Sequence, residues 1–473
     1  MNRIFHIVLF FVLSVSLSAQ TLSLDQTIRV AQDSAIAAYQ SQNALLRAQW
    51  QHEQFLASRR FQLSFVLDPG YQKISTEPFS HYYKLRDYNM LNTYAELRLE
   101  KQASSIGGNF YASTGAMWTE FFGNSSTVPR QFSTVPVGVG YSNSLIGYNP
   151  YKWEKAINDY HIESERKEYL YSLEGIALEA VKLYMDCLVA QSQFEICSVN
   201  AEVAKRMFEI GKEKFEIAAL SKNEICALEL QSVNAENSLF NAEQDMDDAR
   251  EKFLSYLRIE DEGQELKLVT PDIPQKKNII LEDAVRLAKE NNPEYRKSRE
   301  EILSAEQKAD KAKVQASFLQ TSLDLNLGLQ NYDPNFGTAY SGQRPFVMGN
   351  VTLRIPIFDG GLARSRSKAA EYDLAYARDS ENESARRLEL EVTVALREFN
   401  NQQELLVRTS NVLALADESF ALAEELYSNG ETDINTLVIA QNRKDEAHSN
   451  YLKSLKSYWV SYYNLMALCV SEF

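Results

Sequence analysis

The side chains that could do chemistry are scattered along this 473-residue chain, without catalytic or metal-binding spacing. No G-x-S-x-G sequence provides a nucleophile elbow. Gly138-Val139-Gly140 lacks the third glycine of a dinucleotide-binding loop and lies in a strand pattern. The histidines beyond the N-terminal segment have no metal-ligand spacing: His52, His81, His161 and His448. We therefore expect no enzymatic activity, no cofactor and no metal site.

Two further groups of polar residues suggest chemistry only at first sight. Asp324, Asn326 and Gly328 alternate like the start of a calcium loop, but the ligand set is incomplete. None of the four cysteines forms a C-x-x-C pair, which argues against a zinc or redox motif. We expect them to be small buried apolar side chains: Cys187, Cys197, Cys226 and Cys469.

Charge and the first residues narrow the class of protein. The net charge of -15 argues against a nucleic-acid partner. Residues 1–19 carry a basic start, an apolar stretch and a small-residue ending, which predict a secretory signal peptide cleaved after Ala19. A retained N-terminal anchor is the alternative. The rest of the chain has no apolar run of about 18 residues. If it enters a membrane, it must therefore do so as a β-barrel.

The sequence contains an internal repeat. Leu24 to Ala31 resembles Leu281 to Ala288, and each segment opens a helical pattern that ends near Arg60 and Phe318. The boundaries are predicted as residues 20–259 for the first repeat, 260–278 for a Pro- and Gly-containing linker and 279–473 for the second repeat. The offset between matching positions falls along the repeats, so the first repeat carries about 45 extra residues in its β-rich stretch.

A long apolar seam marks the second part of each repeat. From Leu388 to Tyr427, the positions spaced alternately by four and three residues are apolar except Gln402 and Thr409. The positions 212 residues earlier, from Ile176 to Phe215, are all apolar or small. Such a repeat predicts supercoiled helices. The helix after Gly361 is expected to span about 65 residues, or about 100 Å. A long helix in an ordinary bundle is the alternative. Further helices are predicted at 223–257 and 434–470.

Alternating segments between the helices predict strands. In the second repeat, Thr321–Asn331 and Asn350–Ile357 alternate apolar and polar residues, as transmembrane strands do. The residues expected to face lipid are Leu323, Leu325, Leu327, Leu329, Val351, Leu353 and Ile355.

The first repeat has four candidate strands, within residues 61–68, 95–100, 110–122 and 133–141, with a turn at Ser104–Gly108. Two of them are expected to cross the membrane, and the other two to form an external or rim hairpin. The sequence leaves open which pair is which. Four spanning strands cannot close a barrel, and open edges are not tolerated in lipid. Several chains must therefore share one barrel.

The sequence resembles the TolC-type outer-membrane efflux proteins over nearly all of the chain after the signal. The most specific marks are Arg354 to Gly361 before the long helix and Leu426 to Leu437 around the next turn. Pro356, Gly360 and Gly361 mark the junction between barrel and helix. In the first repeat, Asn149-Pro150-Tyr151-Lys152-Trp153 replaces this junction, and Ser144 stands at the position of Pro356.

The resemblance implies a mostly α-helical protein in which each repeat is helix–strand–strand–long helix–helix. Three copies would form a shared twelve-stranded β-barrel in outer-membrane lipid and an α-helical coiled-coil barrel across the periplasm. The implied function is the passive exit duct of a tripartite efflux or type I secretion system. A periplasmic adaptor and an inner-membrane pump or ABC exporter would be its partners. The alternative function is a secreted coiled-coil structural protein or adhesin, which does not explain the alternating strands.

The resemblance also implies a closed periplasmic tip. Tyr427 matches a family tyrosine there, whereas Thr432, Thr436 and Ile439 replace the family's arginine and aspartates. Glu431 and Asp433 are nearby acids that could substitute in the gate, or only cap a helix. The turn between the last two helices contains Gly430, and the matching position in the first repeat is Ala218.

Overall fold

The computed structural model describes residues 21–76, 86–122, 129–217, 220–260, 266–272, 276–317, 319–429, 431–432 and 434–471. The predicted signal peptide lies outside these residues. The chain is mostly helical and contains a large sheet, and its mostly helical composition agrees with the prediction. It divides into two compact units. We call them the helical unit (residues up to Ala44, Lys167–Pro293 and from Arg386) and the sheet unit (Leu45–Arg166 and Glu294–Ala385).

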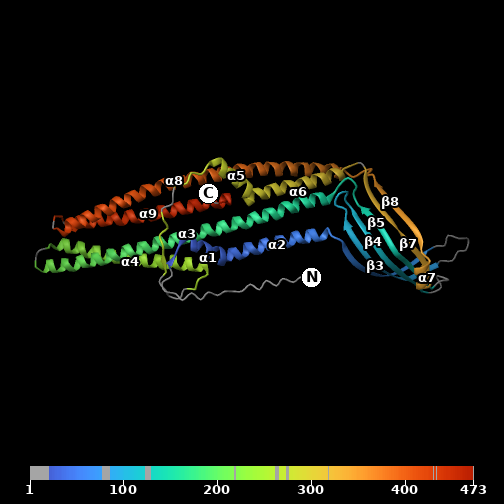
Figure 1. The fold of residues 1–473 in the computed structure, drawn as a ribbon, viewed down its shortest axis with the longest axis horizontal. Coiled ribbons are helices and arrows are strands. Elements are labelled where there is room, and N and C mark those ends of the chain that lie inside the picture. Colours follow the sequence, from blue (N-terminus) through green and yellow to red (C-terminus); the bar gives the residue numbers. More distant parts are fainter. Residues whose placement is uncertain are drawn as a thin grey trace. The chain divides into compact units, whose positions relative to one another are not determined.

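The elements occur twice with equal helix lengths (Figure 1). α1 (Leu24–Ser34) and α5 (Leu281–Asn291) have 11 residues each, and α2 (Ile36–Ser58) and α6 (Pro293–Gln315) have 23 each. α3 (Pro150–Glu216) and α8 (Leu362–Ser428) have 67 each, and α4 (Lys222–Leu257) and α9 (Ile434–Cys469) have 36 each. The two repeats remain a prediction, and these lengths agree with it.

Each first helical pattern is broken once, where the sequence predicted a continuous helix. Asn292 is extended (ψ 122°) between α5 and α6. The following Pro293 explains this break, because a proline disfavours the α conformation in the residue before it. Ala35 has the same extended backbone (ψ 144°) between α1 and α2, although no proline follows it.

The helical unit is built on the two predicted seams. Within α8, the seam residues Val392, Phe399 and Leu406 are almost completely buried. Phe399 packs against the rings of Tyr458 and Tyr462 of α9, with centroids 5.4 and 5.7 Å apart. Regular burial at this spacing is what a supercoiled helix pair requires.

The same unit carries a small parallel sheet of β1 (Thr21–Leu22) and β6 (Lys267–Leu268). The hydroxyl of Tyr184 in α3 lies 3.0 Å from the carbonyl oxygen of Leu22 and 2.5 Å from that of Val269. Burial raises the pKa of this tyrosine to about 12, so it stays a hydrogen-bond donor at physiological pH. This contact ties the start of the chain and the segment after α4 to the long helix.

The sheet unit contains six strands in the order β2-β3-β4-β5-β7-β8, each antiparallel to its neighbours. The strands are β2 (Gln62–Thr76), β3 (Arg86–Gln102), β4 (Asn109–Phe122), β5 (Arg130–Asn143), β7 (Gln320–Asp333) and β8 (Arg344–Arg354). Figure 1 shows β3, β4, β5, β7 and β8 side by side. The short helix α7 (Phe336–Ser341) lies in the β7–β8 loop.

This sheet corrects two predictions. The resemblance implied four strands per chain, but all four strands of the first repeat pair with β7 and β8 in a single sheet. β8 also begins six residues earlier than expected and ends at Arg354, which leaves Ile355 outside the strand. The prolines explain both ends. Pro345 is tolerated near the start of an edge strand, and Pro356 cannot donate to a ladder.

Burial of the α8–α9 contact gives a stability prediction. We expect Phe399→Ala to lower the local free energy of unfolding of α8 and α9 by about 3–5 kcal/mol, because it leaves a cavity between buried rings. Hydrogen exchange of the amides in both helices measures this change. Asn401→Ala, an exposed change two residues along α8, is the matched control. Equal protection in the two variants would contradict the assignment of Phe399 to the core.

Candidate functional site: the sheet and its junction with the helices

The sheet has one apolar face, and strand register shows it directly. Leu63 pairs with Leu99, Leu99 with Ala112, Ala112 with Val139, Val139 with Leu327, and Leu327 with Val347. Paired residues point to the same side of a sheet, so this apolar row crosses all six strands. Both ends of the row are exposed, with Leu63 at 68% and Val347 at 78%.

The opposite face is mainly polar. The row of paired residues adjacent to the apolar row has side chains on this opposite face. It consists of Gln62, Glu100, Tyr111, Gly140, Asn326 and Met348. The next row on this side contains Ser64 and Arg98, and Arg98 forms a salt bridge with Glu100. The guanidinium of Arg98 also lies 4.0 Å from the centre of the Tyr111 ring. This face can line water, and the apolar face can meet hydrocarbon.

The residues that the sequence assigned to lipid lie mostly on the apolar face. Leu323, Leu325, Leu327 and Leu329 of β7 alternate along that side, and Leu323 pairs with Val351. Leu353 follows Val351 two residues along β8. Ile355 lies beyond the strand end and is 46% exposed. Contact with lipid itself stays a prediction for all seven residues.

A capped junction joins β8 to α8. Gly360 and Gly361 both have positive φ angles, of 64° and 87°, and an added Cβ would meet no atom within 4 Å. The backbone conformation, not space, therefore favours glycine at both positions. Pro356 stands between the end of β8 and this turn.

Asp359 caps the start of α8. Its carboxylate accepts hydrogen bonds from the backbone N–H groups of Gly361 (2.9 Å) and Ala363 (2.8 Å). These two bonds lower the pKa of Asp359. The glycines were predicted as junction residues and this aspartate was not, although an Asp shortly before a helix is a recognisable capping signal.

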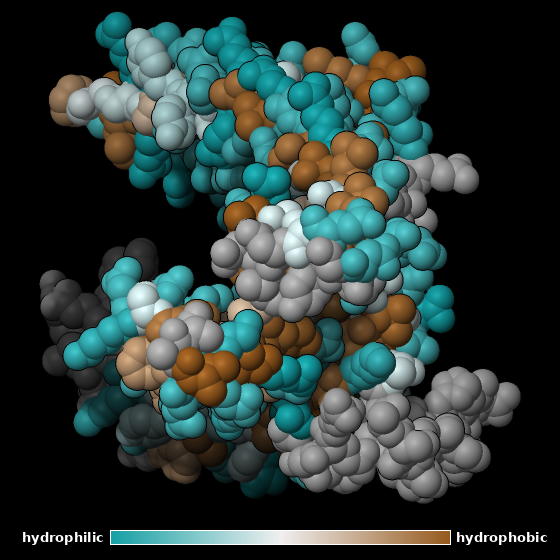
Figure 2. Space-filling model, turned by 90° about the vertical axis from the view of Figure 1, so that its left-hand side faces the viewer, coloured by the Kyte–Doolittle hydropathy of each residue, from teal (hydrophilic) through white to brown (hydrophobic). Residues whose placement is uncertain are grey.

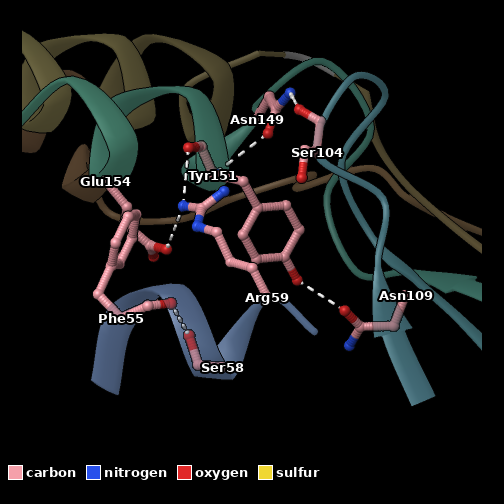
Figure 3. Close-up of polar contacts among 8 residues, drawn as sticks. All are labelled: Phe55, Ser58, Arg59, Ser104, Asn109, Asn149, Tyr151 and Glu154. Atoms are coloured by element: carbon pink, nitrogen blue, oxygen red, sulfur yellow. Dashed lines mark hydrogen bonds and ion pairs between the residues drawn. The ribbon is translucent and has the colours of Figure 1, made fainter. Parts of the chain in front are cut away.

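The first repeat begins its long helix with a different cap. Pro150 is the first residue of α3, where a missing N–H costs nothing. The Asn149 side-chain oxygen accepts from the Tyr151 N–H at 3.1 Å, and its amide nitrogen donates to the Ser104 carbonyl at 2.9 Å. Asn149 therefore holds the start of α3 against the β3–β4 turn (Figure 3).

Arg59, just after α2, completes this junction (Figure 3). Its guanidinium donates to the Tyr151 carbonyl at 2.9 Å, pairs with Glu154 at 3.5 Å and lies 4.2 Å from the Phe55 ring centre. The Tyr151 hydroxyl lies 2.7 Å from the Asn109 side-chain oxygen at the start of β4. One arginine and one tyrosine thus fasten α2, α3 and the sheet together.

A polar hollow of about 740 Å³ lies at the same junction. Its lining includes Lys311 of α6, Asp324 of β7 and Arg354 of β8, together with uncharged polar residues of β4 and β5. The charged groups in this lining carry both signs. Among the residues that the structure describes, no group of three or more His, Cys, Asp or Glu side chains could hold a metal ion.

The predicted tip residues are placed only in part. Tyr427 is the penultimate residue of α8. Glu431 is exposed, and its backbone N–H donates to the Leu426 carbonyl at 2.9 Å. Gly430, Asp433 and Ala218 lie outside the described residues. The gating role of Tyr427, Glu431 and Asp433 therefore stays a prediction.

In the first repeat, a capping box begins the helix after the tip turn. The Glu224 N–H donates to the Ser221 hydroxyl at 3.3 Å, and the Glu224 carboxylate accepts from the Ser221 N–H at 2.7 Å. Hydrogen bonds from the hydroxyl and the backbone N–H of Ser221 to the Glu224 carboxylate lower the pKa of Glu224. Such a box stabilises the first turn of α4.

Comparison with known proteins identifies the fold. Residues 284–469 match the family described as outer membrane efflux protein. None of the curated protein sequences matches the chain. Within the described residues, no helix is long and apolar enough to cross a membrane.

Several solved outer-membrane proteins are similar in structure. The Campylobacter jejuni CmeC outer membrane channel is 14% identical, with a TM-score of 0.65 over 96% of this chain and 90% of that one. The Neisseria gonorrhoeae MtrE outer membrane channel in its open state is 11% identical, with a TM-score of 0.61 over 94% and 88%. The outer membrane protein VceC of Vibrio cholerae is 13% identical, with a TM-score of 0.59 over 94% and 95%. At these identities the likeness shows a shared fold. Together with the family match, it confirms the resemblance to TolC-type outer-membrane channels.

The Asp359 cap predicts a pH effect on the start of α8. Because the pKa of Asp359 is lowered by folding, its contribution is present above the unfolded pKa of about 3.9 and is lost as the pH falls through the folded pKa. After correction for intrinsic exchange rates, we expect protection of the Gly361 and Ala363 amides to fall in this acidic range. Asp359→Asn keeps an acceptor but cannot titrate, so its protection should not change there. An identical pH profile in both proteins would exclude the carboxylate as the cause.

The Arg59 contacts predict a local loss of stability. Arg59→Met keeps the length of the side chain but removes the donor to the Tyr151 carbonyl. Since a hydrogen bond from a charged group contributes about 1.5–3 kcal/mol, hydrogen exchange at the α3 start should accelerate accordingly. Arg60→Met removes an exposed neighbouring charge and is the control. If both variants exchange alike, Arg59 does not hold the junction.

Proposed function

We propose that this chain, whose residues 284–469 match the outer membrane efflux protein family, is one protomer of a trimeric outer-membrane channel. The channel is the passive exit duct of a tripartite efflux or type I secretion system. Its sheet lies in the outer membrane and its helices extend into the periplasm. A periplasmic adaptor and an inner-membrane pump or ABC exporter deliver the cargo, and the pump supplies the energy.

One observation supports this proposal above the others, namely the apolar row that crosses a sheet with two open edges. A soluble sheet would cover such a face with helices or a second sheet. Here the row stays exposed at both ends. In hydrocarbon the apolar face is favourable, but the unpaired edge groups of β2 and β8 must find partners. Further copies of the same chain supply them.

The helical unit supports the same conclusion. Beyond its buried seams, α8 exposes a second set of apolar side chains, including Val394, Leu415 and Leu422 at 52, 66 and 56%. α4 exposes Leu230, Val233 and Phe240 at heptad-like spacing. Figure 2 shows exposed hydrophobic areas between hydrophilic ones on the face at the helix ends. Neighbouring copies in a coiled-coil barrel would cover such stripes.

The comparisons add the fold of known outer-membrane channels over nearly the whole chain. In this proposal the pump selects the cargo. The alternative of a secreted coiled-coil adhesin explains the helices and the signal sequence. It gives no reason for an apolar face on a six-stranded sheet.

Conductance tests this function. In planar bilayers the purified protein should open discrete channels, and Tyr427→Ala should raise the open probability several-fold, because the tyrosine restrains the closed tip in our proposal. Tyr376→Ala, which changes an exposed tyrosine elsewhere on α8, is the control and should not alter gating. A membrane-inserted protein that never conducts, with either change, would overturn the channel function.

Membrane extraction separates the channel from the adhesin. A protein embedded through its sheet stays in the outer membrane after carbonate or urea washing. A peripheral coiled-coil protein is released by the same washes.

A further inference from the structure

We propose that each copy contributes all six strands to the barrel, with β8 of one copy pairing with β2 of the next copy. A ring of three copies then has eighteen strands rather than the twelve that the resemblance implied. This inference rests on the proposed channel function and specifies how the chains meet in the membrane.

Continuous backbone pairing keeps all six strands in one sheet. β2 and β3 pair from Gln62–Glu100 to Thr76–Arg86, and β3 and β4 pair from Asn89–Phe122 to Gln102–Asn109. β5 pairs with β7 from Phe132–Asp333 to Asn143–Leu323, across one irregularity. A hairpin standing outside the barrel would have to leave the sheet at one of these ladders. None of the five ladders is interrupted in that way.

The apolar row also runs through the middle strands β3 and β4. It includes Leu99 of β3 and Ala112 of β4, between Leu63 of β2 and Val139 of β5. A hairpin at the rim, in water, would have no reason to continue the hydrocarbon-facing row in register. Every strand also reaches the roughly 9–11 residues that a tilted transmembrane strand needs.

The directions of the two edge strands allow them to pair between copies. Six antiparallel strands in a row place β2 and β8 in opposite directions. The free edge of β8 can therefore join the free edge of β2 from another copy as a further antiparallel pair, as membrane barrels require. Within one copy, four strands lie between β2 and β8, and six strands are too few to close a barrel alone.

Side-chain exposure at the two edges points to a second copy as the occupant. Phe65 of β2 and Val351 of β8 lie on the apolar side and are 64 and 60% exposed. To keep the apolar faces aligned, residues such as Leu63, Phe65 and Leu67 must pair with the alternate β8 residues Val347, Gly349 and Val351. Pairing in the other phase would put Asn350 and Thr352 into hydrocarbon.

The strand number has a functional consequence. Barrel diameter grows with the number of strands, and about 16–18 strands leave an aqueous channel. An eighteen-stranded barrel is wider than a twelve-stranded one. The membrane part of this duct would then admit larger cargo.

Disulfide crosslinking tests which strands meet. In a background where the four natural cysteines are replaced by alanine, one cysteine is introduced by Val347→Cys, Gly349→Cys or Val351→Cys, and a second by Leu63→Cys, Phe65→Cys or Leu67→Cys. Facing residues of antiparallel strands have Cβ atoms about 4.5–5.5 Å apart, which is close to disulfide geometry. Oxidation in intact outer membranes should give, for at least one pair, a covalent trimer and no larger product.

Two controls make this result decisive. Thr352→Cys, on the opposite side of β8, should not crosslink with the same β2 partners. Phe65→Cys with Leu97→Cys joins two strands that pair within one copy and should form an internal disulfide. A covalent dimer as the largest product would mean twelve strands from two copies. Internal closure, or no crosslink in any β2–β8 pair when the Phe65–Leu97 control reacts, would overturn the proposal.

A labelling experiment checks the middle strands independently. Leu99→Cys and Ala112→Cys, in β3 and β4, should resist a water-soluble maleimide to the same degree as Leu327→Cys in β7, and should react with a lipid-soluble one. Water-soluble labelling of the first two positions alone would place the β3–β4 hairpin outside the barrel. That result would overturn the six-strand proposal while conductance still supported the channel. Labelling at all three positions without conductance would instead remove the channel function itself.

Discussion

The structure depends on one constraint, which is that the backbone groups at the edges of a membrane sheet must be paired. Hydrocarbon offers no hydrogen-bond partners, so an open edge there costs several kcal/mol for each unsatisfied group. This chain has a sheet with an apolar face and two open edges, β2 and β8. The fold of a single copy therefore leaves two strand edges unpaired in hydrocarbon. In the proposed channel, pairing with further copies completes the sheet.

In the helices, the backbone groups are paired within each helix, so the long rods need only side-chain packing. The heptad seams supply it within the chain, as the burial of Phe399 between α8 and α9 shows. The apolar residues left exposed on α4 and α8 are then available for packing between copies.

The junction connects the sheet to the long helices. Strands end where the ladder can no longer continue, and long helices begin where a side chain satisfies their first N–H groups. Asn149 does this for α3 and Asp359 for α8, with different residues and different neighbours. Arg59 and Tyr151 then fix the end of α2 and the start of α3 to the β3–β4 end of the sheet. These polar contacts hold the geometry of the junction.

The sequence by itself determined the element types, because their signals are local. Alternation along Leu323–Leu329, the four-three spacing in both seams and Gly360-Gly361 each reflect the geometry of one strand, helix or turn. Only the tertiary structure decided how many strands share the sheet. The β5–β7 ladder joins residues separated by about 190 positions, and alternation within one strand does not specify its neighbour. The contacts of Arg59 also belong to this second class. They join it to Tyr151 and Glu154, which are distant in the sequence and which no local pattern places beside it.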